Sequence, residues 1–302
     1  MWDRSGTDRM AAFCRDRQID CIIPLSQKMY FTCGRLARQL DIALVLRLGI
    51  VRLPWRPVVD WYGYGIYPDA VIVNTERIKE VLSRAPFVRP ERIHVIYNGI
   101  VERPATGVAR QADKFTITSV GTLSWRKGME HLIKAVALLP DELRKKVHVK
   151  LIGQGPAREK LTGLAEKLNL AAQVEFTGHI ENPAAHIAAS NLFLLLSVQE
   201  GISNALLEAM NCGVPAYATL VGGHGEFIED AINAYAARSR RPSQIADDLA
   251  GIMSDHNIAA VGAAGRDTVC KKFSITAMGD RLEEILELAE KSPAGSPTGP
   301  NR

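Results

Sequence analysis

Short apolar runs alternate with amphipathic segments along almost the whole chain. Apolar runs predict strands, and helical periodicity predicts helices between them. In the front part of the chain, the strands are expected at 21–24, 43–46, 70–73 and 94–97, and the helices near 8–17, 30–39 and 75–83. Strands that alternate with helices in this way are typical of βαβ units with parallel strands. The pattern therefore predicts an α/β fold.

The same alternation begins again at Phe115. A strand at 115–120 and a helix at 128–139 open this second part, and the alternation continues to about Met253. Two further helices are expected near 256–272 and 276–291. Asn98-Gly99 and the turn-rich Arg103-Pro-Ala-Thr-Gly107 separate the two parts. We therefore expect a front domain over 1–107, a second domain over 108–274, a terminal helix over 275–291 and a disordered tail, rich in Ser, Pro and Gly, over 292–302.

The segment from Leu192 onward carries the most informative chemistry. Leu192-Phe-Leu-Leu-Leu196 predicts a buried parallel strand whose carboxyl end delivers Ser197 to Glu200 into a crevice. Ser203 suits the N-cap of a helix from about Asn204 to Met210, whose free amides and positive dipole end suit a phosphate. Glu208 lies one turn further along this helix. One carboxylate near a phosphate site and another placed for sugar hydroxyls predict a nucleotide-sugar pocket.

The segment Glu200-Gly-Ile-Ser-Asn-Ala-Leu-Leu-Glu208 resembles the E-x7-E signature of retaining glycosyltransferases of family 4. Further blocks resemble the same family in the family's order, over about residues 114 to 230. They are Val120-Gly-Thr-Leu-Ser-Trp-Arg-Lys-Gly128, Leu151-Ile-Gly-Gln-Gly-Pro156, Phe176-Thr-Gly178, Gly213-Val-Pro215 and Val221-Gly-Gly-His-Gly-Glu226. The resemblance implies the GT-B fold of two Rossmann-like domains, with the terminal helix packed back on the front domain.

The resemblance also implies an activity. A sugar would pass from a nucleotide-diphosphate sugar to a glycan or lipid-linked acceptor with retention of configuration, as in polysaccharide or lipopolysaccharide biosynthesis. No cofactor and no metal are expected. Glu200 and Lys127 would be the catalytic residues, and Glu208 would bind the ribose hydroxyls. Gly201, Ile202, Ser203 and Asn204 would offer backbone amides to the sugar and phosphate, and Leu207 would also contact the donor.

Lys127 stands at an unusual place for a lysine, because a cation is unfavourable at the amino end of a helix. It lies directly before the helix at 128–139, where its ammonium can reach a diphosphate, and this mismatch indicates a functional lysine. In the family an arginine often stands at the position of Thr122. By resemblance Thr122 is therefore expected at the donor site, and Arg126 is the candidate for a second cation there.

Gly153-x-Gly155 follows the predicted strand 147–152 and lacks the third glycine of a dinucleotide fingerprint. It predicts a tight turn with Pro156 at the first helical position, which by resemblance lines the base pocket. Gly178 and His179 are expected to edge that pocket. His179 and His224 are isolated histidines, a pattern more typical of structural or surface positions.

The composition is that of a globular protein, with 47% hydrophobic and 23% charged residues among 302. Five cysteines without C-x-x-C spacing indicate neither a disulfide framework nor a zinc site, and we infer the cytosol. Residues 1–109 hold 16 basic against 11 acidic side chains, a net charge of +5, whereas 110–302 carry −1. This basic front is either a solvated surface or a means of peripheral docking at the inner face of a membrane. The aromatic residues are not interleaved with the basic ones, so no nucleic acid is expected as a partner.

The front domain departs from the family pattern. Family members carry a longer front domain that opens with a strand and a glycine-rich loop, so roughly the first third of a usual enzyme is expected to be absent. A fragment, a misassigned start codon, a degenerate gene and a separate subunit that supplies the missing strands are the alternatives. Near Arg47-Leu-Gly49 the family usually has an acceptor-side histidine; Arg47 is the candidate there, for an anionic acceptor. Two other functions stay open: an inactive remnant that binds nucleotide, and a sugar-nucleotide epimerase of the same fold.

Overall fold

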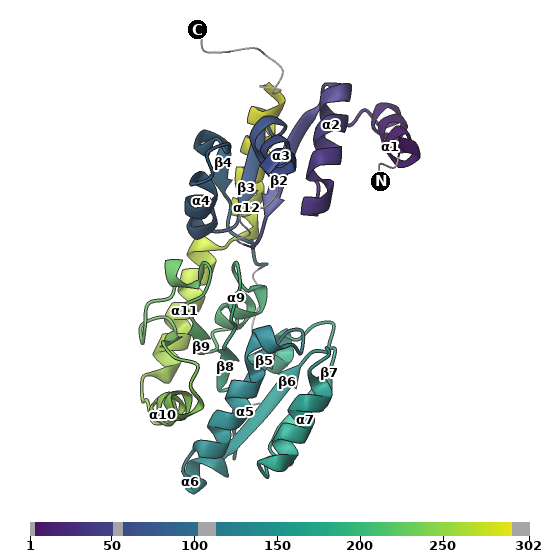
Figure 1. The fold of residues 1–302 in the computed structure, drawn as a ribbon. Helices are drawn as coiled ribbons and strands as arrows, with labels where there is room; N and C mark the ends of the chain where they lie inside the picture. The colour runs from purple at the N-terminus through teal and green to yellow at the C-terminus, as the bar shows by residue number, and fades with distance from the viewer. Residues whose placement is uncertain (1–3, 51–56, 102–112, 292–302) are drawn as a thin grey trace. The chain divides into compact units, whose positions relative to one another are not determined.

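The chain divides into two compact units. Unit 1 contains residues 1–97 and 276–302, and unit 2 contains residues 98–275. The computed structural model describes residues 4–50, 57–101 and 113–291; the expected boundary at 107 and the expected tail at 292–302 lie outside this part of the chain. Each unit has its own parallel β-sheet with helices packed against it (Figure 1). The predicted α/β fold with two Rossmann-like domains is confirmed.

Unit 1 is built on a four-stranded sheet in the order β1-β2-β3-β4, in which all neighbours are parallel. Its strands are β1 (Cys21–Ile22), β2 (Ala43–Leu48), β3 (Ala70–Val73) and β4 (Ile93–Val95). Its helices are α1 (Arg4–Asp16), α2 (Tyr30–Leu40), α3 (Pro57–Asp60), α4 (Glu76–Ser83) and α12 (Ile275–Lys291), with short turns η1 (Gln27–Met29) and η3 (Pro90–Arg92) and a π-helix η2 (Trp61–Ile66). The sequence pattern predicts neither α3 nor η2, because both are short and lack an apolar period.

The strand β2 shows how the sheet of unit 1 acquires two buried faces. Leu44 and Leu46 pack in the cluster formed with α2 and α4, whereas Val45 packs on the opposite face with Ile285 of α12. Successive side chains of a strand point to opposite faces, so the apolar run at 43–46 fits a sheet covered on both sides. The helix α12, at the end of the chain, therefore completes the core of the first unit.

Unit 2 is built on a six-stranded parallel sheet in the order β10-β9-β8-β5-β6-β7. Its strands are β5 (Phe115–Val120), β6 (Val147–Ile152), β7 (Val174–Gly178), β8 (Leu192–Leu195), β9 (Ala216–Thr219) and β10 (Tyr235–Ala237). Its helices are α5 (Met129–Leu138), α6 (Asp141–Arg144), α7 (Arg158–Lys167), α8 (Ala184–Ala188), α9 (Asn204–Asn211), α10 (Pro242–Met253) and α11 (Ile258–Lys272), with turns η4 (Trp125–Lys127) and η5 (His224–Glu226). The predicted strands 115–120 and 147–152 agree with β5 and β6 at both ends.

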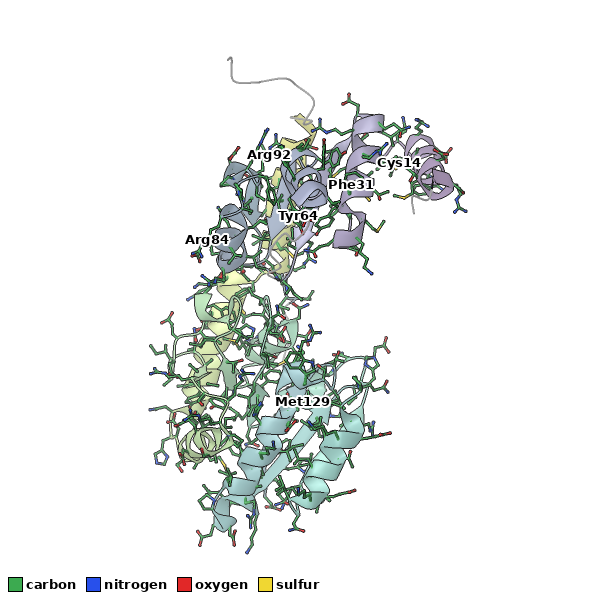
Figure 2. The ribbon with its side chains drawn as sticks, in the orientation of Figure 1. Cys14, Phe31, Tyr64, Arg84, Arg92 and Met129 are labelled. Atoms are coloured by element: carbon green, nitrogen blue, oxygen red, sulfur yellow. The ribbon has the colours of Figure 1, made fainter. Side chains whose placement is uncertain are left out.

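The order of strands in unit 2 determines where a ligand can bind. The chain begins the sheet at β5, adds β6 and β7 on one side, and then returns to add β8, β9 and β10 on the other. Met129, the first residue of α5, is buried in the large core between this sheet and the helices α5, α7 and α10 (Figure 2). In open α/β sheets, ligands bind outside the carboxyl ends of the strands where the strand order reverses. That point lies between β5 and β8.

One predicted helix start is wrong. The sequence places Pro156 at the first helical position, but α7 begins at Arg158 after the N-cap Ala157. Leu123 N–H donates to Gln154 O at 2.9 Å and Ala157 N–H donates to Leu123 O at 3.0 Å. These bonds hold residues 154–157 as a turn against the neighbouring loop, so the helix starts two residues later. None of the described helices combines the length and apolar character needed to cross a bilayer.

We expect Ile285→Ala to lower the free energy of unfolding of unit 1 by about 2–5 kcal/mol, because it leaves a cavity beneath α12. Ile285 is 0% exposed, whereas Leu288 on the same helix is 52% exposed. Leu288→Ala is therefore the matched control, with an expected change within about 0.5 kcal/mol. Urea denaturation followed by circular dichroism measures both. Equal effects of the two substitutions would show that α12 does not pack as described.

Candidate active site

Lys127 and Glu200 form an ion pair at the point where the strand order of unit 2 reverses. Lys127 Nζ lies 2.5 Å from Glu200 Oε1, and the two side chains are 22% and 15% exposed. Ser197 Oγ donates a second hydrogen bond to the same oxygen at 2.8 Å. Lys127 follows β5 and Glu200 follows β8, so the pair joins the loops that follow these two neighbouring strands. The structure thus brings together the two residues that the sequence predicts to be catalytic.

Backbone contacts hold these two loops together. Val198 N–H donates to Arg126 O at 2.7 Å. Gly128 adopts the left-handed conformation (φ +71°), and a Cβ atom at this position would lie 2.1 Å from Leu196 O. Only glycine allows the start of α5 to approach the end of β8 this closely. The position of Lys127 beside the loop of Glu200 therefore depends on the glycine that follows it.

The amino end of α9 faces the same loop, and Ser203 is its N-cap, as predicted. The Ser203 side chain makes no capping hydrogen bond, and the Ser203 N–H donates to His224 Nε2 at 3.3 Å. In this structure the Ser203 amide is therefore already engaged, and its contact with a donor stays a prediction. The amides of Gly201, Ile202 and Asn204 make no hydrogen bond to another group within the described ranges. These three remain the candidate phosphate donors.

His224 organises the backbone of this region. It is completely buried; its Nδ1 lies 2.8 Å from Thr219 O, and its Nε2 accepts from Ser203. The two bonds together require the neutral ring with the proton on Nδ1. Burial lowers the pKa of His224, and the hydrogen bond to Thr219 opposes this shift only in part. The sequence indicates a structural histidine, and in the structure this histidine positions the backbone at the start of α9.

Two further contacts connect His224 to Glu200. Thr219 Oγ1 donates to Ser197 O at 2.8 Å, which ties the end of β9 to the end of β8. Gly222 has φ +62°, and a Cβ atom there would lie 2.2 Å from Glu200 O. The sequence places Ser197 in the loop that enters the site but gives it no role, and it does not predict Thr219 or His224 as site residues. The pair Gly222-Gly223 before His224 is the one sequence signal that points to close backbone approach in this loop.

The glycines predicted for the base pocket lie at the carboxyl ends of β6 and β7. Gly153 N–H donates to Gly178 O at 2.7 Å, and a Cβ atom at Gly153 would lie 2.0 Å from Gly121 O. Both Gly153 and Gly178 have positive φ angles, +141° and +75°. These glycines bring the loops after β5, β6 and β7 into contact. His179 follows as an exposed side chain.

The remaining predicted donor residues differ in accessibility. Thr122 and Arg126 are exposed on the loop that carries Lys127, and Glu208 is half-buried on α9. Ile202 is only 6% exposed. Leu207 is 0% exposed and its N–H donates to Ser203 O at 3.1 Å, so it anchors the helix. A direct contact of Leu207 with a donor is not supported.

Arg47 belongs to unit 1 and lines a cavity in that unit. It is the one exposed side chain of β2, and Tyr30 Oη donates to its backbone oxygen at 2.9 Å. With Lys28 and Gln27, it lines a pocket of about 370 Å³. The pocket carries two cationic side chains, which suits the predicted anionic acceptor.

Solved structures of other proteins share this fold. A structure from Anabaena, Alr3699/HepE in complex with UDP, superimposes with a TM-score of 0.83 over 93% of this chain and 81% of its own, at 20% identity. Sucrose-phosphate synthase from Thermosynechococcus elongatus superimposes with a TM-score of 0.79 over 93% of this chain and 76% of its own, also at 20% identity. At this identity the similarity establishes the fold, and it confirms the predicted GT-B fold with two Rossmann-like domains.

Among curated proteins, the lipopolysaccharide core biosynthesis glycosyltransferase LpsE of Rhizobium meliloti is 28% identical over 72% of this chain. The N-acetyl-alpha-D-glucosaminyl L-malate synthase of Bacillus anthracis is 31% identical over 53% of it. The matched segments span 64% and 42% of these two relatives. The family model described as "Glycosyl transferases group 1" matches residues 106–268, more than half of the chain. This protein therefore belongs to the group 1 glycosyl transferases.

Proposed function

We propose that this protein is a retaining glycosyltransferase that takes a sugar from a nucleotide-diphosphate sugar. The observation that carries the proposal is the Lys127–Glu200 ion pair beside the amino end of α9, at the reversal point of the sheet in unit 2. The membership of the chain in a glycosyltransferase family supports it, as does the UDP held by the Anabaena protein of the same fold. Family 4 membership and retention rest on the E-x7-E resemblance.

The departing diphosphate is the group that needs stabilisation. Negative charge accumulates on it as the bond to the sugar breaks, and donors already in position stabilise such charge most effectively. Lys127 would supply an ammonium, and the backbone amides of Gly201, Ile202 and Asn204 would supply N–H groups at the positive end of α9. These groups provide charge neutralisation without a metal ion, which is why we propose a metal-independent reaction.

Glu200 has two roles in this proposal. Its carboxylate fixes Lys127 in the absence of donor, and it stays close enough to the diphosphate to contact the transferred sugar. Because Ser197 holds the same carboxylate oxygen, Glu200 keeps its orientation when Lys127 turns toward a diphosphate. Glu208, one turn along α9, would accept hydrogen bonds from the ribose hydroxyls. Gly153, Gly178 and His179 would border the base.

The acceptor is proposed to be a glycan or a lipid-linked sugar. The curated relatives include an N-acetylgalactosaminyltransferase of Campylobacter jejuni whose name specifies a diphospho-undecaprenol acceptor. Arg47 is the proposed acceptor-side residue, through the cationic pocket of unit 1. A lipid-linked acceptor would place the protein at the inner face of the membrane as a peripheral protein, and the basic front part of the chain suits an anionic surface.

We expect Lys127→Ala to weaken UDP binding about 10–100-fold, because a charge-assisted hydrogen bond contributes about 1.5–3 kcal/mol. Isothermal titration calorimetry with UDP measures the change. Lys134→Ala is the matched control: Lys134 also pairs with a glutamate, Glu130 at 2.7 Å, but on the surface of α5. Unchanged UDP affinity in a folded Lys127→Ala variant would contradict the proposed diphosphate site.

We expect Glu208→Gln to lower the affinity for UDP about tenfold and to reduce the preference for UDP over 2′-deoxy-UDP. The carboxylate accepts hydroxyl protons more strongly than an amide oxygen does. Titration of both nucleotides against the wild type and the variant separates a ribose contact from a general loss of binding. A parallel loss for both nucleotides would argue against a ribose role.

Retention makes a separate prediction. An α-linked donor such as UDP-glucose is expected to yield an α-linked product, which the coupling of the anomeric proton in the NMR spectrum identifies. A β-linked product would contradict the retaining mechanism. It would not contradict the proposed donor-binding site.

A further inference from the structure

Four aromatic side chains of unit 1 form a cluster at its surface, where η2 packs beside α2. The centroid of the Tyr62 ring lies 6.2 Å from that of Phe31, 6.5 Å from that of Trp61 and 5.6 Å from that of Tyr67. Trp61 is 54% and Tyr62 is 39% exposed, whereas Phe31, labelled in Figure 2, and Tyr67 are half-buried. We call these four residues the aromatic patch. Large apolar side chains that gather at a surface mark an interaction site.

Close packing beneath the aromatic patch holds it in place. A Cβ atom at Gly34 of α2 would collide with the Tyr67 ring, and one at Gly65 of η2 would collide with the backbone oxygen of Phe87. Glycine at these two positions therefore allows η2 to lie close to both neighbours. The middle of η2, residues 63–65, is buried. The exposed rings at the start of η2 are thus carried by a packed element.

Two arginines border the aromatic patch at the end of η2. Arg38 Nη2 donates to Ile66 O at 2.8 Å, and Arg92 Nη1 donates to Pro68 O at 2.7 Å. Tyr67 lies between these two carbonyl groups in the chain, so both guanidinium groups lie near its ring. The patch therefore has positive charge beside it.

A third arginine extends this positive border, and acidic side chains do not cancel it. Arg35 is exposed one turn after Phe31 on α2, so the two share a face of the helix. The helix α2 contains no Asp or Glu, and η2 contains no charged residue. Of the two aspartates that flank η2, Asp69 accepts the backbone N–H of Leu44 at 2.9 Å and Asp60 is half-buried.

This combination of side chains suits the surface of a lipid bilayer. Trp and Tyr rings are enriched at membrane–water interfaces, where the ring meets the apolar layer and its polar tip stays hydrated. Arginine pairs with phosphate through charge-assisted hydrogen bonds. A stable protein interface buries about 800 Å² per partner. Four rings of about 150–250 Å² each, the most exposed of them 54% accessible, offer much less than that.

We propose that the aromatic patch binds unit 1 to an anionic phospholipid surface, with Arg35, Arg38 and Arg92 against the lipid phosphates. The inference rests on the proposed function for its purpose, because a lipid-linked acceptor is reached at a bilayer. It assigns the contact to named residues of α2 and η2. The patch lies in unit 1 and the proposed donor site lies in unit 2, so vesicle binding and UDP binding can fail separately.

Flotation of the full chain with lipid vesicles, without nucleotide, tests the proposal. We expect vesicles of phosphatidylcholine with about one third phosphatidylglycerol to bind at least about tenfold more tightly than vesicles of phosphatidylcholine alone. Substituting Trp61→Ala and Tyr62→Ala together is expected to lower binding to the anionic vesicles about tenfold or more. Arg35→Gln is expected to lower it about fivefold. Circular dichroism verifies that the variants are folded, and their affinity for UDP is expected to equal that of the wild type.

Trp125→Ala and Arg266→Gln are the matched controls, because both side chains are exposed in unit 2, Trp125 to 73%. Both variants are expected to bind the vesicles like the wild type. The proposal is overturned if the wild type shows no preference for anionic vesicles, if the double substitution leaves vesicle binding unchanged, or if Trp125→Ala weakens it equally. Sedimentation velocity gives a fourth test: a dimer that the double substitution abolishes would assign the aromatic patch to a second copy of the chain.

Discussion

The ion pair between Lys127 and Glu200 is the interaction on which the proposed active site depends. It forms because parallel strands β5 and β8 are neighbours and their carboxyl ends open at the same edge of the sheet. Gly128 lets α5 begin close to Leu196, and Gly222 lets the loop after β9 approach Glu200. The position of a charged pair is thus determined by glycines at which a side chain would collide with backbone. The order of the strands places the Lys127 loop beside the Glu200 loop, and the glycines let the backbones of these loops approach closely.

The parts of this site that depend on local signals are predictable from the sequence. The apolar run 192–196, the N-cap Ser203 and a lysine at an unfavourable helix end are readable from neighbouring residues, and all three are found near their predicted places. The contact between Lys127 and Glu200 can be inferred only through strand order, because 73 residues separate them. Strand order is a property of the whole sheet, and the family resemblance supplies it.

Other features are not predictable from the sequence, because they depend on contacts between residues that are far apart in the chain. The capture of the Ser203 amide by His224 depends on a hydrogen bond between residues 21 apart, and a lone histidine in sequence gives no sign of its partner. Pro156 suits the first turn of a helix, but bonds to Leu123 hold that segment as a loop. The π-helix η2 has no distinct sequence period. The expected absence of front strands stays a prediction, as does the assignment of Arg47 to the acceptor.

The central claim is that Lys127 and the amino end of α9 bind the diphosphate of the donor. The most direct test is a crystal structure of this protein with bound UDP. The account predicts the β-phosphate within hydrogen-bond distance, about 3 Å, of Lys127 Nζ and of at least one of the backbone amides of Gly201, Ile202 and Asn204. A UDP molecule whose phosphates contact neither group would contradict it.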